Sequence, residues 1–484
     1  MQKILHISRI PSIDQVRTNP TSIKILVVGS VIGLSALSAL LFSDSALTII
    51  LLFLVGVVAA SIFIRWPPLG IIVAMVGGLF IPYSGPSGLN ATLLVVAFLL
   101  GLWIVEMLVS RSERKVISSR ILWLSLAFIF TSLLSFGLGQ LNWYNFGRHA
   151  PVGAQAGGAA IFILSIGAFL LAANRIGSLK WLEWITWVYI GISAAILFFR
   201  VLGSWTGVNL DFISFISTPG AVFWIWAAGL TMGQAFFNRK LHPALRIMLF
   251  LMVALICYHL YFERFQNKSG WVSVFICIAA VVGSRSFRTS VVIFITLSIV
   301  LGGLYLFTDA ISSEDYSLST RLEAGELMVE MLRANPLLGL GFANPHEYAT
   351  LFPIRGWEVE FSSHNNFIDI TLQTGLLGLF LFLALLAEIT KLMLRLRKRI
   401  PAGGFSQAYL YSSLGCLAGM IVAGLLADWI LPFFYNIGLN GFRVSVIGWL
   451  FLGGILLLER AYPPKPPSEE LHVAQRVILQ RNPN

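Results

Sequence analysis

The stretch from Ile368 to Thr390 reads IDITLQTGLLGLFLFLALLAEIT, in which only Asp369 and Glu388 are charged, and it decides the fold class. A helix that crosses a bilayer needs about 20 mostly apolar residues. Similar runs recur along the whole chain of 484 residues, of which 57% are hydrophobic and 11% are charged. Soluble domains carry about 25% charged residues. The sequence therefore predicts an all-α polytopic integral membrane protein and excludes an ordinary soluble domain or a disordered chain.

The apolar runs of the chain give the number of membrane spans. Two of the candidates, 69–82 and 270–283, are short for a span, so we expect 12 to 14 transmembrane helices. The candidate runs lie at 23–42, 46–64, 69–82, 89–109, 121–139, 155–173, 182–202, 219–237, 245–262, 270–283, 289–307, 368–390, 407–427 and 439–458.

Lys and Arg residues fix the expected orientation, because cytoplasmic loops carry an excess of them. If residue 1 lies in the cytoplasm and 14 spans alternate, 25 of the 33 Lys and Arg residues fall on the cytoplasmic side. The net charge of +11 then points to membrane lipids, and not to nucleic acid, as the partner of the basic residues. We expect cytoplasmic tails at 1–22 and 459–484, an N-terminal transmembrane bundle at 23–307, a long periplasmic loop at 308–367 and C-terminal transmembrane helices at 368–458.

The basic residues that remain on the outer side are candidates for binding an anion. Several of them stand at helix mouths beside aromatic residues or glycines, where a cation is positioned to hold an anion that arrives in the membrane plane, such as a lipid diphosphate. The alternative interpretation is that each of them is an ordinary surface residue without a binding role. The eight are Arg148, Arg200, Arg264, Lys268, Arg321, Arg333, Arg355 and Arg443.

A helix is predicted in the outer loop. Thr320 with Glu323 forms a capping box, which favours a helix start there. Asn335-Pro336 ends the helix near Arg333. Arg321 would then lie in the first turn, where a cation and the helix N-terminus attract a phosphate together. A salt bridge from Arg321 to Glu323 is the alternative.

A polar cluster, Ser362-Ser363-His364-Asn365-Asn366, directly precedes the span that begins near Phe367. At a membrane mouth of this kind, a neutral imidazole can take a proton from an attacking hydroxyl group. His364 is therefore a candidate general base. The alternative is that His364 only caps the following helix and packs the loop against it.

Residues 319–380 resemble the signature region of the O-antigen ligase and O-antigen polymerase superfamily of bacterial envelope glycosyltransferases. That family carries His-Asn, nine residues and Gly-x-x-Gly, and here His364-Asn365 is followed at that spacing by Gly375-Leu-Leu-Gly378. Its Asn-Pro-Leu-x-Gly-x-Gly element matches residues 335–341, and Arg321 matches its upstream arginine. Lys268-Ser-Gly-Trp271 resembles a Ser-Arg-Gly-x-Trp-like element, with lysine where arginine is common.

The resemblance implies a GT-C-like fold and a metal-independent inverting glycosyltransferase that needs no cofactor. Such an enzyme moves a polysaccharide from undecaprenyl diphosphate to an acceptor at the periplasmic face of the inner membrane. Because only one outer loop is long, we expect ligation to lipid A–core; polymerisation onto a lipid-linked glycan is the alternative. His364 and Arg321 would be catalytic. The donor diphosphate or glycan would be bound by Lys268, Arg264, Arg200 and Asn365.

A multispanning transporter is the second hypothesis, from a different class of protein. Ionisable residues within membrane spans mark ion paths in transporters. No inverted repeat, which transporters commonly carry, is visible in the sequence. The ionisable residues in or near the predicted spans are Glu106, Glu183, His259, Glu388 and Asp428.

Overall fold

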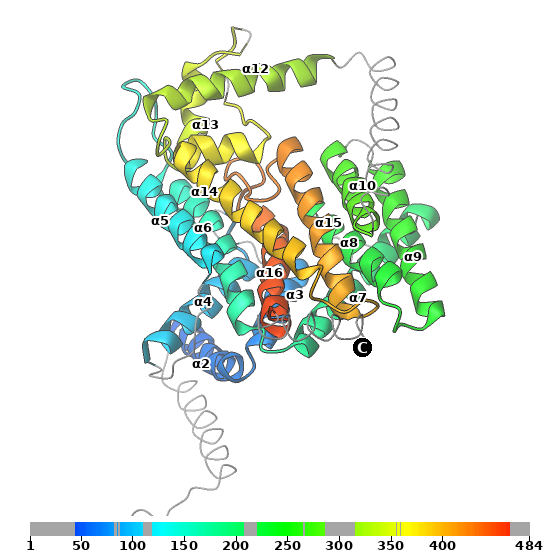
Figure 1. The fold of residues 1–484 in the computed structure, drawn as a ribbon. Coiled ribbons are helices and arrows are strands. Elements are labelled where there is room, and N and C mark those ends of the chain that lie inside the picture. Colours follow the sequence, from blue (N-terminus) through cyan, green and yellow to red (C-terminus); the bar gives the residue numbers. More distant parts are fainter. Residues whose placement is uncertain are drawn as a thin grey trace, which may run out of the picture. The chain divides into compact units, whose positions relative to one another are not determined.

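A computed structural model of the protein describes residues 44–81, 85, 88–109, 119–207, 220–264, 267–285, 315–354, 356–358 and 360–464 (Figure 1). Within these ranges the regular elements are all helices, and an isolated bridge pairs Ile354 with Trp357. The predicted all-α class is confirmed.

The helical elements have the following bounds. They are α2 (Asp44–Arg65), α3 (Pro67–Phe80), α4 (Ala91–Val109), α5 (Arg120–Leu138), α6 (Val152–Arg175), α7 (Leu179–Thr206), α8 (Ala221–Phe237), α9 (Pro243–Tyr258), η4 (His259–Glu263), α10 (Lys268–Gly283), α12 (Asp315–Met331), η5 (Leu332–Ala334), α13 (Asn344–Tyr348), η6 (Ala349–Leu351), α14 (Asn366–Leu396), α15 (Phe405–Leu426) and α16 (Gly438–Ala461).

Eight helices of the described residues are long and apolar enough to cross a membrane, so the protein is a polytopic membrane protein. They are α4, α5, α6, α7, α9 with η4, α14, α15 and α16. Shorter apolar helices coincide with the short predicted runs at 69–82 and 270–283. The predicted spans at 23–42 and 289–307 lie outside the described residues.

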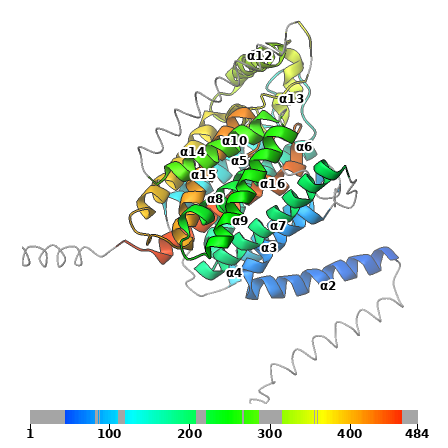
Figure 2. The same cartoon turned by 90° about the vertical axis from the view of Figure 1, so that its right-hand side faces the viewer.

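The chain divides into two units, residues 1–66 and 67–484. In the first, α2 is an apolar helix with Arg65 in its last turn. In the second, α16 forms the centre of the core, since its whole apolar window is buried (Figures 1 and 2). Glycines let neighbours approach it: a Cβ atom at Gly453 would lie 2.4 Å from the Phe169 carbonyl oxygen of α6.

Basic residues gather at one end of the second unit, where loops between different helices are held together. The Arg239 N–H donates to the Gly403 carbonyl (3.1 Å), the Arg397 guanidinium to the Ser284 carbonyl (2.8 Å), and the Arg460 guanidinium to the Ala173 carbonyl (2.6 Å). These arginines belong to the set expected on the cytoplasmic side. The opposite end, where α14 begins beneath α12, is called the α12 end below (Figure 1).

The outer-loop helix α12 starts earlier than predicted. It begins at Asp315, so Thr320 lies inside it and is not its N-cap. Arg321 is accordingly in the second turn and does not share the helix N-terminus. An acidic residue favours a helix start through the helix dipole, and no breaker separates Asp315 from Thr320. The predicted end near Arg333 is confirmed, because the 3₁₀ turn η5 closes the helix before Asn335.

Candidate functional site

Helix α14 is broken near its start, at Gly375, whose φ and ψ are 72° and −178°. The glycine-rich segment 335–341, called the glycine loop below, pairs with the backbone on both sides of this break. The donors and acceptors are Leu340 N to Leu372 O (2.8 Å), Gly341 N to Gln373 O (3.3 Å), Leu376 N to Pro336 O (2.9 Å) and Leu377 N to Leu337 O (3.1 Å).

The glycines at this junction are required by close backbone approach. A Cβ atom at Gly375 would lie 2.1 Å from the Leu337 carbonyl oxygen, and Gly375 also has a positive φ that other residues rarely adopt. A Cβ atom at Gly341 would lie 2.3 Å from the Cα atom of Gly139 at the end of α5. The two glycine motifs, 335–341 and 375–378, therefore form one structural unit.

The segment before α14 presents His364. Asn365 is the N-cap of α14: its side-chain oxygen accepts hydrogen bonds from the N–H groups of Phe367 (2.9 Å) and Ile368 (3.4 Å). His364 itself has a left-handed backbone conformation, with φ of 49°, and its side chain is half-buried. The interpretation of His364 as the helix cap is therefore wrong, and the side chain of Asn365, expected to bind substrate, has a capping role.

The connection between α15 and α16, residues 427–437, is called the floor loop because it lies against the start of α14. Asn366 fixes this contact, since its amide donates to the Leu431 carbonyl (2.7 Å) and accepts from the Ile430 N–H (2.7 Å). The Asn436 amide of the floor loop lies 3.0 Å from His364 Nδ1. His364 is thus held by a loop that is distant in the sequence.

Two buried carboxyl groups contact residues next to His364: Asp428 contacts Asn436, and Asp369 contacts Ser363. Asp428 of the floor loop is fully buried; its Oδ1 lies 2.5 Å from the Asn436 amide, and its Oδ2 accepts from the Phe433 N–H (2.8 Å). Asp369 of α14 is 2% exposed, accepts from the Ser363 hydroxyl (2.6 Å) at Oδ1, and has no hydrogen-bond partner at Oδ2. Burial raises the pKa of Asp428, against the lowering effect of its hydrogen bonds.

Lys268 lies at the first residue of α10, and its side chain is exposed. The next residue, Ser269, accepts a hydrogen bond from the Trp429 indole (3.0 Å), and Trp429 follows Asp428 in the floor loop. The floor loop therefore has His364 against one part and the start of α10 against another. The structure brings these two predicted site segments together.

Arg321 lies in α12, and its side chain is outside the described part of the structure. One turn further along α12, a Cβ atom at Gly325 would lie 3.5 Å from Ile368 in the first turn of α14. The backbone that carries Arg321 thus runs close to the segment that carries His364.

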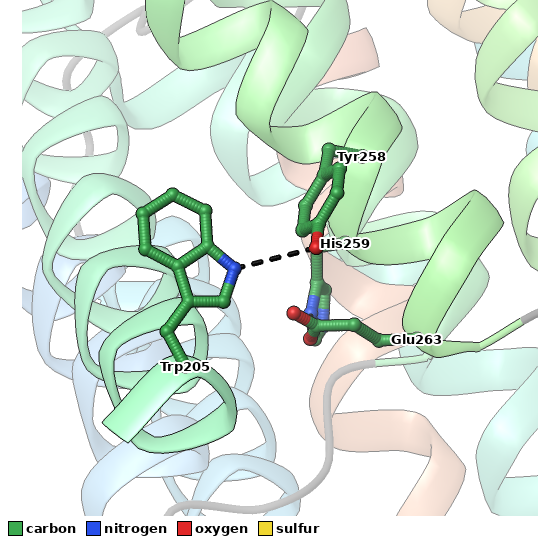
Figure 3. A network of polar contacts seen from close by, with 4 residues as sticks. All are labelled: Trp205, Tyr258, His259 and Glu263. Carbon is green, nitrogen blue, oxygen red and sulfur yellow. Dashed lines mark hydrogen bonds and ion pairs between the residues drawn. The ribbon is translucent and has the colours of Figure 1, made fainter. Parts of the chain in front are cut away.

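Arg200 and Arg264 belong to a second cluster, built where α9 ends in the π-helical turn η4. Within this turn, His259 Nδ1 contacts the Glu263 carboxylate at 2.5 Å, and the His259 ring is 4% exposed (Figure 3). The Trp205 indole at the end of α7 donates to the Tyr258 hydroxyl (3.3 Å), which joins α7 to α9 (Figure 3). Arg200 and Arg264 interact electrostatically with each other.

An apolar groove opens beside the His364 segment, between α12 and α14. Its volume is about 200 Å³, and it is lined by Met328, Val329, Leu332, Asn365, Phe367, Ile368, Thr371, Leu372 and Leu379. A second hollow of about 390 Å³ follows α14 along α15 and shares Phe367 with the first; its other lining residues are Leu383, Leu386, Ala387, Thr390, Lys391 and Ile421. Apolar concave surface thus runs from Asn365 along α14.

Asp369, Asp428 and Asn436 are the residues of this site that sequence reasoning did not select for a role in transfer. In the sequence, Asp428 stands out only as an ionisable residue near a span end, and Asn436 carries no signal, because a link across 72 residues has no local pattern. Among the described residues, no three His, Cys, Asp or Glu side chains are grouped so that they could hold a metal ion. A scan against models of known protein families matches none of them, and a search of curated proteins finds no relative.

Proposed function

We propose that the protein is a glycosyltransferase of the O-antigen ligase type, which transfers a polysaccharide from undecaprenyl diphosphate to an acceptor hydroxyl group. One observation carries the proposal: the His-Asn, Gly-x-x-Gly and Asn-Pro-Leu-x-Gly-x-Gly segments, separated in the sequence, meet at one broken helix with His364 beside an apolar groove. The backbone hydrogen bonds between the glycine loop and the break in α14 support the proposal.

The reaction is a single displacement at the anomeric carbon of the donor sugar. The acceptor oxygen forms the new glycosidic bond while the bond to the diphosphate oxygen breaks, and undecaprenyl diphosphate leaves with the electron pair. His364 Nε2 takes the proton of the acceptor hydroxyl, since Nδ1 faces Asn436. One displacement inverts the configuration of the sugar.

Cations stabilise the leaving diphosphate, which is the main electrostatic requirement of the step. Arg321 and Lys268 are the first candidates, because their helices start or pass beside the His364 segment and the floor loop. Arg264 and Arg200 follow, since they lie in the neighbouring cluster around η4. No metal ion or other cofactor is part of the proposal.

The groove beside His364 supports a lipid-linked donor. Its lining is apolar on both α12 and α14, and Asn365 stands at its polar edge. A polyprenyl chain on this surface would place its diphosphate at the α12 end. The acceptor then arrives from the water side.

The basic end of the bundle supports an orientation with the α12 end in the periplasm and both termini in the cytoplasm of a bacterial inner membrane. Lipid A–core is the acceptor that we favour, because one outer segment is long in the sequence. A second lipid-linked glycan, as in a polymerase, is the alternative acceptor.

The transporter hypothesis receives less support. Three of its ionisable residues are engaged locally: Glu106 with Arg175 (2.7 Å), Glu388 with Lys391 (2.9 Å), and His259 within η4. Asp428 lies in the floor loop and not within a spanning helix.

The test is transfer by the purified protein in detergent, with an undecaprenyl-diphosphate-linked glycan and either lipid A–core or a second lipid-linked glycan as acceptor. We expect glycan on lipid A–core, with an equal yield in the presence of a metal chelator. Product only on the lipid-linked glycan would identify a polymerase. No transfer to either acceptor would contradict the proposal.

A further inference from the structure

The short helix α13 contacts both segments that meet at His364, the one before α14 and the floor loop. It follows the glycine loop directly and lies next to α12 and α14 (Figure 1). Asn344, its first residue, fixes it to the glycine loop: the side-chain amide donates to the Leu340 carbonyl (2.9 Å) and to the carbonyl of Gly139, the C-cap of α5 (2.8 Å). Because the glycine loop is bonded to the broken part of α14, α13 has a fixed place relative to that helix.

Two adjacent residues of α13 hold Tyr435 of the floor loop. The His346 ring stacks on the Tyr435 ring, with centroids 4.4 Å apart and an interplanar angle of 25°. The Tyr435 hydroxyl donates to the Glu347 carboxylate (2.9 Å). Burial, with the neighbouring Glu347 and Glu360 carboxylates, raises the pKa of Tyr435, so its hydroxyl group keeps the proton that it donates. Tyr435 is therefore fixed by a ring contact and a hydrogen bond together.

Tyr435 directly precedes the residue that contacts the His364 ring. This residue is Asn436, whose amide lies 3.0 Å from His364 Nδ1, so a shift of the Tyr435 backbone also moves this amide. In the other segment, His346 Nε2 lies 3.2 Å from the carboxylate of Glu360. The Glu360 side chain is 56% exposed, and ion pairs with exposed groups contribute little. The contacts on Tyr435 are therefore the stronger link between α13 and the His364 site.

We infer that the contact of α13 with Tyr435 positions the base of the transfer reaction, because it holds the Asn436 amide against His364. His346, Glu347 and Tyr435 are positioning residues in this account, and they act on His364 through Asn436. The inference rests on the proposed function for its effect on turnover, since His364 is the residue that they orient. A merely structural role of Tyr435 would change the stability of the protein and leave the turnover of each folded molecule unchanged.

Tyr435→Phe is the first test, because it removes the hydroxyl group and keeps the ring that stacks on His346. We expect kcat for transfer in detergent to fall by about 10–10²-fold, because a misplacement of about 1 Å at the reacting groups can cost up to this much. The KM for the lipid-linked glycan should stay near that of the wild type, since the apolar groove is lined mainly by α12 and α14. Tyr462→Phe is the matched control: it loses a hydrogen bond to the Ser406 hydroxyl (3.0 Å) near the basic end and should keep both constants. A changed KM with an unchanged kcat, or equal losses in both variants, would overturn the inference.

Variants of Glu347 test whether the hydrogen bond to Tyr435 is the interaction that matters. Glu347→Gln keeps a carbonyl oxygen that accepts from the Tyr435 hydroxyl, so kcat should stay near normal, whereas Glu347→Ala should lower kcat as Tyr435→Phe does. The double variant Tyr435→Phe/Glu347→Ala should be no worse than either single variant, because all three lose the same interaction. Losses that multiply in the double variant, or equal losses in Glu347→Gln and Glu347→Ala, would overturn the inference.

Nitrogen NMR of the full-length protein in lipid, labelled with ¹⁵N-histidine, separates a failure of this inference from a failure of the proposed function, because it needs no substrate. His364→Gln identifies the His364 signals by difference among the seven histidines. We expect these signals to move in Tyr435→Phe and to keep their wild-type positions in Tyr462→Phe. Unchanged His364 signals in folded Tyr435→Phe would overturn the inference. Moved signals in a protein without transfer activity would support the positioning contact and contradict the proposed function alone. If Tyr435→Phe fails to fold, Glu347→Ala is measured in its place.

Discussion

Two histidines of the α12 end are paired with acids in different ways, and the contrast separates a site for chemistry from a structural contact. His259 contacts Glu263 directly, four residues further along the same π-helical turn, and its ring is 4% exposed. His364 reaches Asp428 only through Asn436, from another part of the chain, and lies half-buried beside a groove. An enclosed ring cannot meet a substrate. The half-buried His364 ring is not enclosed in this way.

Of the arginines beside the two histidines, the one that we place on the His364 side should have the larger effect. Arg321→Ala should lower turnover by about 10²–10³-fold, the usual cost of removing one group that stabilises transition-state charge. Arg200→Ala, beside His259, should cost less. The measurement is single-turnover transfer from a lipid-linked glycan.

Arg333→Ala is the matched control for Arg321, since it lies just after the same helix and its side chain is 81% exposed. We expect near-normal transfer from this variant. Equal losses in both variants would mean that α12 only supports the fold, and a greater loss for Arg200→Ala would reverse the ranking of the two histidine sites.

The break in α14 distinguishes the His364 side in its backbone as well. Gly375→Ala should destabilise the protein by about 2–6 kcal/mol, because strain at positive φ costs about 1–3 kcal/mol and overpacking costs a similar amount. Gly191→Ala in α7, where a Cβ atom meets nothing within 4 Å, is the control and should be neutral or slightly stabilising. Thermal unfolding in detergent measures both. A melting temperature for Gly375→Ala equal to that of the control would contradict the tight pairing with the glycine loop.

The smallest effect on transfer should come from the enclosed histidine. His259→Leu leaves the Glu263 carboxylate without its partner, which should cost about 1–3 kcal/mol of stability. Turnover per folded molecule should stay close to that of the wild type. His259→Gln, which keeps a donor for Glu263, should recover most of the stability. A large loss of turnover in a stable His259 variant would show that the second cluster also takes part in the reaction.

The spanning helices were predictable because each carries its own signal, a long apolar run that needs no partner to be recognised. The start of α12 was missed, since Thr320 and Glu323 satisfy a capping pattern although the helix already begins at Asp315. A helix can continue through a sequence that matches a capping pattern when no Gly or Pro interrupts it.

His364 was predictable from its place in a motif, but its surroundings were not. The contacts of Asn436 and Asp428 with the His364 segment depend on how α15 and α16 pack against α14, which periodicity along one helix cannot reveal. The role of the glycines at 339, 341 and 375 was likewise hidden, because it lies in backbone contacts between two segments.

The central claim is that the His364 imidazole accepts the proton of the acceptor hydroxyl group, and His364→Asn tests it most directly. Asparagine tolerates the left-handed conformation found here, with φ of 49°, so the fold should be kept. Transfer from an undecaprenyl-diphosphate-linked glycan should fall by about 10²–10⁴-fold, the usual contribution of general acid–base catalysis, with an unchanged melting temperature. Turnover equal to that of the wild type would contradict the account.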